Sequence, residues 1–100
     1  MTDLLQWYLY EISAEDSPLH SVKLRGKIRK FAIVHGVNIQ VENATDKDNV
    51  VRFAVLSHDN ARAVSDYVVS IIHDAKVVLL KDDIQNPVLS KMIVNTYEKY

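Results

Sequence analysis

Side chains that could carry chemistry are few in this chain and widely spaced. It has no cysteine, which excludes thiol nucleophiles, disulfides and cysteine-bound metal centres. Its two glycines, Gly26 and Gly36, are too few and too far apart to form a P-loop or a Rossmann phosphate loop. Four histidines are scattered without metal-ligand spacing: His20, His35, His58 and His73. We therefore expect no metal site and no cofactor.

Acidic and hydroxyl side chains form no catalytic set either. The segment Asp46-Lys47-Asp48-Asn49 lacks the glycine and the distal glutamate of a calcium loop, and its carboxylates are typical of a solvated turn. Ser17, Ser21 and Ser57 have no catalytic-triad context, and turns or helix caps account for them. General acid–base and serine-nucleophile chemistry are therefore not indicated.

A basic segment is the strongest local signal. The formal net charge is −1, yet residues 17–41 contain five of the 12 bases and none of the 13 acids. The bases are Lys23, Arg25, Lys27, Arg29 and Lys30. The remainder then holds 7 bases and 13 acids, so a local anion site fits this distribution better than a surface that coats nucleic acid.

Residues 21–35 have the apolar spacing of an amphipathic helix. Ser21 would cap it, and Gly36 would end it in the left-handed conformation. Arg25 then lies in the first turn, where unpaired N–H groups and the helix dipole attract anions. Its guanidinium offers a planar, bidentate fork for phosphate. An exposed helix residue without a ligand is the alternative interpretation.

The other elements complete an α+β pattern. We expect strands over 4–12, 38–43, 50–56 and 76–80, a helix from about 58 to 74, a loop over 82–87 and a last strand over 91–96. The order predicts a single domain, residues 1–100, with a ferredoxin-like βαββαβ sandwich. Its antiparallel sheet would have four to five strands, with two helices on one face.

The segment His20-Ser21-Val22-Lys23-Leu24-Arg25 resembles the end of the acylphosphatase loop motif, G-R-V-Q-G-V-x-F-R, with Arg25 on the arginine of the motif. Gly36 follows eleven residues later, as does the glycine that ends the first helix of that family. Val41-Glu42-Asn43 then matches the V-x-N pattern of the next strand. The resemblance covers essentially the whole chain, although Ser21 replaces the second motif glycine.

The resemblance implies an acylphosphatase-like hydrolase that cleaves acyl phosphates. Arg25 would bind the phosphate and Asn43 would orient the attacking water. The phosphate-binding loop would comprise Leu19, His20, Ser21, Val22, Lys23 and Leu24. A carboxylate leaving group is stable as an anion, so placement of water and stabilisation of phosphoryl charge suffice. The expected ligands are an acyl phosphate, inorganic phosphate or sulfate.

Two other functions are left open. An inactive acylphosphatase-like domain that binds an anion or a protein partner is consistent with the missing loop glycines. It is also consistent with an aromatic strand, Trp7, Tyr8 and Tyr10, part of which would face solvent or cover a partner. RNA binding through the sheet is not favoured, because residues 50–56 lack the wording of the RNA-recognition motif.

The chain also shows no sign of a membrane or export segment. Its first residues have no basic region followed by an apolar run, and no stretch of 18 apolar residues occurs. We therefore expect a cytoplasmic protein.

Overall fold

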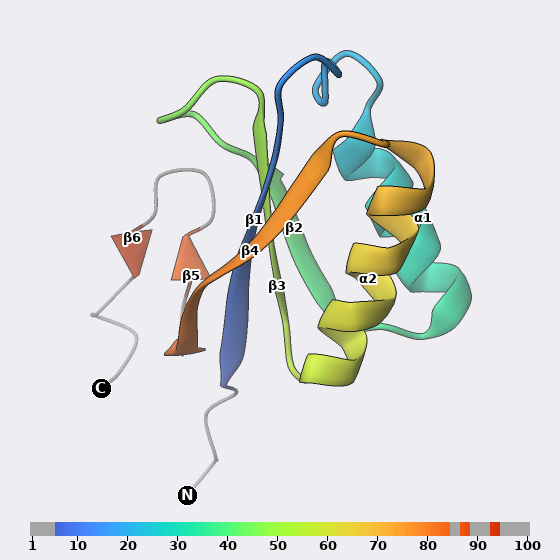
Figure 1. The fold of residues 1–100 in the computed structure, drawn as a ribbon. Helices are drawn as coiled ribbons and strands as arrows, with labels where there is room; N and C mark the ends of the chain where they lie inside the picture. Colours follow the sequence, from blue (N-terminus) through green and yellow to red (C-terminus); the bar gives the residue numbers. More distant parts are fainter. Residues whose placement is uncertain (1–5, 85–86, 89–92, 95–100) are drawn as a thin grey trace, which may run out of the picture.

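The fold is an α+β arrangement of a four-stranded antiparallel sheet and two helices, in a computed structural model that describes residues 6–84, 87–88 and 93–94. The strands are β1 (Trp7–Ala14), β2 (Ile39–Asn43), β3 (Val50–Val55) and β4 (Ala75–Ile84), in the order β2-β3-β1-β4. The helices α1 (Leu24–His35) and α2 (His58–Ile71) cover one face (Figure 1). This confirms the predicted class, and the arrangement is compatible with a ferredoxin-like fold.

Two short strands lie apart from the main sheet. β5 (Pro87–Val88) and β6 (Ile93–Val94) pair with each other, on the side away from the helices (Figure 1). The strand predicted over 91–96 is described only at 93–94, and there it does not join the four-stranded sheet.

The ends of the outer strands differ from the prediction. The loop predicted over 82–87 is wrong at 82–84, where β4 continues because Ile84 pairs with Trp7 and is buried; residues 85–86 lie outside the described part. β1 runs to Ala14, two residues beyond the predicted strand, because Ala14 pairs with Ala75. Residues 4–5 of the predicted strand are also outside the described part.

The main core lies between the sheet and the helices. Alternate strand residues point to one face, which places Ile12, Val41 and Phe53 against the helices. They pack with Leu24, Ile28, Val64 and Val68, among other buried residues. The apolar spacing read from the sequence therefore identifies most of the buried helix positions, although His35 and Ile71, at the ends of the two helices, are exposed.

The opposite face carries a smaller core, and it decides where the aromatic residues of β1 lie. Trp7 is 8% exposed and packs with Leu9, Ala54 and Ile84. Tyr8 and Tyr10 lie instead on the helix side of the sheet, where the ring of Tyr10 stacks on that of Phe53 with 5.1 Å between the ring centroids. Part of this aromatic set was expected to face solvent: Tyr8 and Tyr10 are half-buried, whereas Trp7 is buried.

The cap predicted at Ser21 is wrong, because residues 19–23 form a turn and α1 begins at Leu24. The residue at its N-cap is Lys23, in the left-handed conformation with φ 59°, and it makes no side-chain capping bond. Gly36 ends the helix with φ 66°, as predicted.

The second helix begins as expected and ends early. The Ser57 hydroxyl accepts a hydrogen bond from the Asn60 N–H at 3.1 Å, which is an N-cap contact. The helix ends at Ile71 rather than near Asp74, because Ile72 turns to an extended conformation and is buried in the core. Among the described residues, no helix is long and apolar enough to cross a membrane.

Candidate functional site

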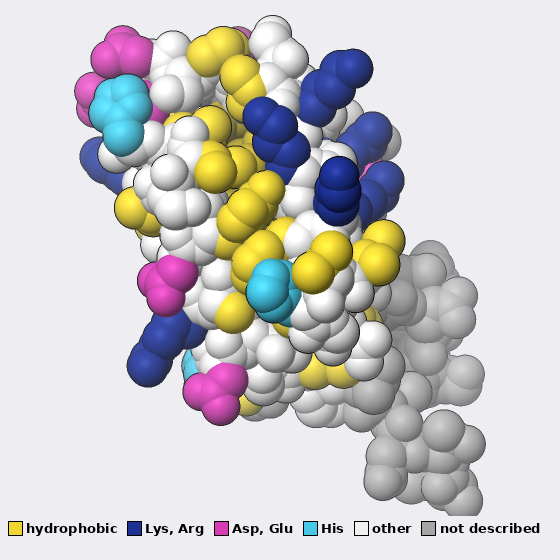
Figure 2. Space-filling view, turned by 90° about the vertical axis from the view of Figure 1, so that its right-hand side faces the viewer, with side chains coloured by type: hydrophobic (Ala, Val, Ile, Leu, Met, Phe, Trp, Pro, Cys, Tyr) yellow, Lys and Arg dark blue, Asp and Glu magenta, His cyan; other side chains and the backbone are white. Residues whose placement is uncertain are grey.

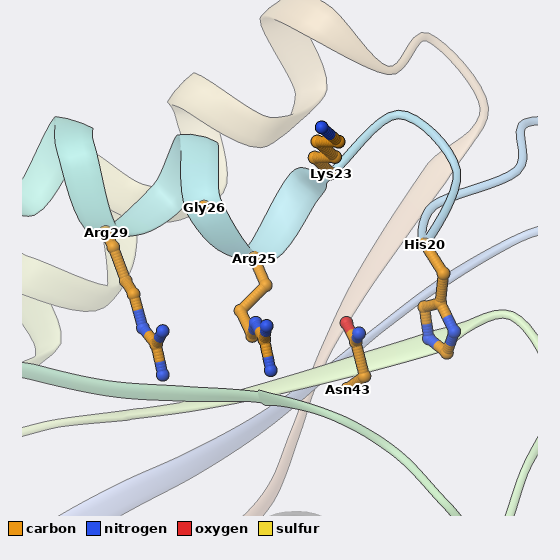
Figure 3. Close-up of a pocket in the computed structure, with 6 residues that line it drawn as sticks. All are labelled: His20, Lys23, Arg25, Gly26, Arg29 and Asn43. Carbon is orange, nitrogen blue, oxygen red and sulfur yellow. The ribbon is translucent and has the colours of Figure 1, made fainter.

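A pocket of about 270 Å³ lies where the start of α1, the loop before it and the end of β2 meet. Its walls are formed by His20, Lys23, Arg25, Gly26, Arg29 and Asn43 (Figure 3). Arg25 and Arg29 are one helical turn apart, so they lie on the same side of α1. The two residues expected to act on a phosphate, Arg25 and Asn43, thus line one pocket although they are distant in sequence.

Asn43 is placed by the pleat of β2. It is paired with Val51 in the register that keeps Val41 against the helices, so its side chain lies on the helix side of the sheet. The Asn43 Oδ1 atom is buried and has no hydrogen-bond partner among the described residues. A buried acceptor without a donor costs free energy. The pocket therefore offers a place for a hydrogen-bond donor such as water.

Glu42 connects the two arginines of the pocket. Its Oε2 accepts from Arg25 Nη1 at 3.3 Å, and its Oε1 accepts from Arg29 Nη2 at 3.1 Å. The three side chains are 42–49% exposed, so these are partly solvated ion pairs. Arg29 Nη2 also donates to the Val41 carbonyl at 3.2 Å. The guanidinium groups are therefore held beside β2, next to Asn43.

Most N–H groups of the predicted phosphate loop bond within the chain. Leu19 N–H donates to Asn49 Oδ1 at 2.7 Å, Val22 N–H to the Pro18 carbonyl at 3.0 Å, and Lys23 N–H to the His20 carbonyl at 3.1 Å. Leu24 N–H donates to the Leu19 carbonyl at 3.1 Å. These four groups are engaged within the chain, three of them by carbonyls of residues 18–20 and one by Asn49, so fewer loop N–H groups remain for an anion.

Other N–H groups around the pocket have no such partner. In the described residues, the N–H groups of His20, Ser21, Arg25 and Gly26 donate no hydrogen bond within the chain. Arg25 and Gly26 are in the first turn of α1, where N–H groups have no intrahelical acceptor. Three of these four residues, His20, Arg25 and Gly26, line the pocket, and two of the three belong to the helix start.

His20 has a defined orientation at the edge of the pocket. Its Nε2 is 2.8 Å from the Val50 carbonyl oxygen. A carbonyl oxygen can only accept, so Nε2 carries the hydrogen and donates.

Two side chains from elsewhere in the chain hold the loop in place. Asn49, with φ 54°, donates from Nδ2 to the carbonyls of Ala14 and Ser17 at 2.9 and 2.8 Å, in addition to its bond with Leu19. Asp74 accepts from the Ser17 hydroxyl and from the N–H groups of Asp16 and Ser17. These bonds, that from the Ser17 hydroxyl foremost, hold the pKa of the Asp74 carboxyl well below its usual value.

The electrostatic character of the pocket is positive. Lys23, Arg25 and Arg29 line it, whereas Glu42 is the acidic residue in contact with its arginines. In Figure 2, Lys and Arg side chains gather on one side of the helix face. Among the described residues, no group of His, Cys, Asp or Glu side chains could hold a metal ion.

Reasoning from the sequence missed Arg29 and Gly26 as individual pocket residues, and it missed Asn49 and Asp74 as supports of the loop. The spacing of Arg25 and Arg29 was the available signal for the second arginine. No comparable signal linked Asn49 or Asp74 to the loop, because their contacts join distant segments.

No protein-family model matches the chain, and no curated protein matches it in sequence.

Proposed function

We propose that the pocket binds the phosphoryl group of an acyl phosphate and that the protein hydrolyses it. In this proposal the chain is an acylphosphatase-like domain with a ferredoxin-like βαββαβ fold. The observation that carries the proposal is the convergence of Arg25 and Asn43 on one pocket, with the buried Asn43 Oδ1 lacking a donor.

Each pocket residue has a role that its chemistry allows. Arg25 donates to two phosphoryl oxygens, as a guanidinium does with a phosphate. The unbonded N–H groups of Arg25 and Gly26 at the helix start favour the same negative charge. Lys23, which also lines the pocket, adds positive charge. Asn43 accepts a hydrogen bond from a water molecule through Oδ1 and so directs its oxygen to phosphorus.

The reaction transfers a phosphoryl group from a carboxylate to water. The water oxygen forms a bond to phosphorus as the bond from phosphorus to the acyl oxygen breaks, and the carboxylate leaves with the bonding pair. The second proton of the water is released to solvent or to the phosphate formed. Because the carboxylate is a good leaving group, catalysis consists of positioning and charge stabilisation.

The test is release of inorganic phosphate from an aryl acyl phosphate. We expect Arg25→Gln and Asn43→Ala each to reduce kcat/KM by about 10²–10³-fold, as loss of a charge-stabilising or positioning group does. Arg62→Gln, which removes an exposed cation of α2 outside the pocket, is the matched control and should retain activity. No hydrolysis above background by the unchanged protein would contradict the proposal.

A second candidate is a domain that binds an anion without turnover. It is favoured by the four N–H groups of the loop that bond within the chain and by the hold of Glu42 on Arg25. It predicts that phosphate shifts the amide resonances of residues 17–26 while acyl phosphate remains intact. An absence of such shifts would exclude this candidate as well.

A further inference from the structure

Glu42 lies beside the pocket in a position that a bound anion would need to share. Its two carboxylate oxygens are divided between the pocket arginines, at 3.3 Å from Arg25 Nη1 and 3.1 Å from Arg29 Nη2. It therefore makes to these guanidinium groups the kind of contact that a phosphoryl oxygen would make.

We infer that Glu42 is an internal anion that competes with the ligand for Arg25 and lowers the affinity of the pocket for phosphate. This inference rests on the proposed anion-binding role of Arg25. It assigns a function to a residue that stands at the variable position of the V-x-N pattern, where neither phosphate binding nor water positioning is expected.

The two arginines respond differently to the loss of Glu42. Arg29 has a second partner, the Val41 carbonyl, which holds it beside β2. Arg25 has Glu42 as its hydrogen-bond partner in the described part of the chain. Displacement of Glu42 therefore releases Arg25 for a ligand while Arg29 keeps a contact.

The competition is weak enough to be overcome. Both ion pairs are about half exposed. Such pairs contribute little free energy, because solvent screens the charges and holding two long side chains in one geometry costs entropy. Neighbouring residues of a strand point to opposite faces, so Glu42 can move without displacing Asn43. A phosphate dianion carries more charge than the carboxylate that it replaces. Glu42 thus raises the phosphate concentration that is needed to occupy the pocket, but it does not prevent binding.

The experiment is a titration of the full chain with inorganic phosphate at constant pH and ionic strength, followed by calorimetry and amide resonances. We expect Glu42→Gln to bind phosphate roughly three- to tenfold more tightly than the unchanged protein, which corresponds to the loss of one or two exposed ion pairs. Asp66→Asn, an equal charge change at an exposed site on α2, should alter the affinity by less than about twofold because distant surface charges are screened.

A double-mutant cycle assigns the effect to Arg25. In the Arg25→Gln background, Glu42→Gln should give a much smaller gain, since the guanidinium in competition is gone. In the unchanged protein, phosphate should also shift the Glu42 carboxyl carbon resonance as the ion pair is released. Urea denaturation of each variant verifies that the fold is kept.

The outcomes separate this inference from the proposed hydrolysis. Unchanged or weaker phosphate binding by Glu42→Gln would overturn the inference, even if the protein hydrolyses acyl phosphates. Weaker binding would show instead that Glu42 orients Arg25. An absence of phosphate binding in every variant would overturn it too. Tighter binding by Glu42→Gln without hydrolysis by any variant would support the inference and reject the hydrolase.

Discussion

At the scale of single residues, the Asn49 side chain takes part in three hydrogen bonds to the backbone of distant residues. Its side chain joins the end of β1 to the loop before α1 through bonds to Ala14, Ser17 and Leu19. Its φ of 54° lies in the left-handed region, which asparagine tolerates better than most residues. The backbone conformation and the three hydrogen bonds are separable, and substitutions can test each.

We predict that Asn49→Gly lowers the free energy of unfolding by about 2–4 kcal/mol, because it keeps the backbone conformation and removes three hydrogen bonds. Asn49→Ala should lose about 1 kcal/mol more, since alanine is strained at this φ. Urea denaturation measures both. Asp48→Ala, at an exposed position in the same turn, is the control. If Asn49→Gly is as stable as the unchanged protein, the three side-chain hydrogen bonds of Asn49 do not stabilise the fold as proposed.

At the scale of the element, the N-terminus of α1 combines an unusual backbone conformation with residues of the candidate site. It starts after Lys23, a non-glycine residue with φ 59°, and this turn presents Lys23 and Arg25 at the pocket. Backbone strain of this kind is found at functional sites, although it is retained only where the surroundings enforce it. The same helix contains Gly26, which has an ordinary helical conformation, and is ended by Gly36, which has a positive φ.

We predict opposite effects of alanine at the two glycines. Gly26→Ala should raise the free energy of unfolding by about 0.5–1 kcal/mol, because Gly26 is inside the helix and an added Cβ meets no atom within 4 Å. Gly36→Ala should lower it by about 1 kcal/mol, because Gly36 has φ 66° and alanine is strained there. Chemical denaturation of both variants is the measurement, and effects of the same sign would contradict this account.

At the scale of the whole molecule, contacts between distant segments hold the loop before α1 and the β2–β3 turn in place. Asp74, in the connection from α2 to β4, holds the loop that leads to α1. On the far face of the sheet, the buried Arg52 pairs with Glu11 at 3.0 Å and with Asp46 at 2.7 Å, which joins β1 to the β2–β3 turn. Hydrogen bonds and charge from Arg52 lower the pKa of the Asp46 carboxyl.

We predict that Asp74 makes the stability depend on pH in acid. Its pKa is lowered in the folded state relative to its usual value of 3.8, so its contribution is complete above that pH and is lost as the pH falls further. Asp74→Asn should be less stable than the unchanged protein at pH 7, and the difference should shrink below about pH 3.8. Thermal unfolding from pH 7 to pH 2 measures this, and a gap that is constant with pH would contradict it.

The sequence by itself determined the order of elements, the apolar faces and two helix ends. These follow from local rules: spacing of apolar residues, the hydroxyl of Ser57 as a cap and the conformational freedom of Gly36. It also indicated a basic helix start with Arg25, and an asparagine at the end of a strand. Local patterns carry this information because they depend on residues within a few positions of each other.

The tertiary structure decided what those residues do together. Only the pairing of β2 with β3 and the packing of α1 bring Asn43 to Arg25, and only the turn at residues 19–23 replaces Ser21 with Lys23 at the N-cap. The bonds of Asn49, Asp74 and Glu42 span 13 to 58 positions. Such contacts leave no periodic signal, because their partners become neighbours through the assembly of the sheet and not through local conformation.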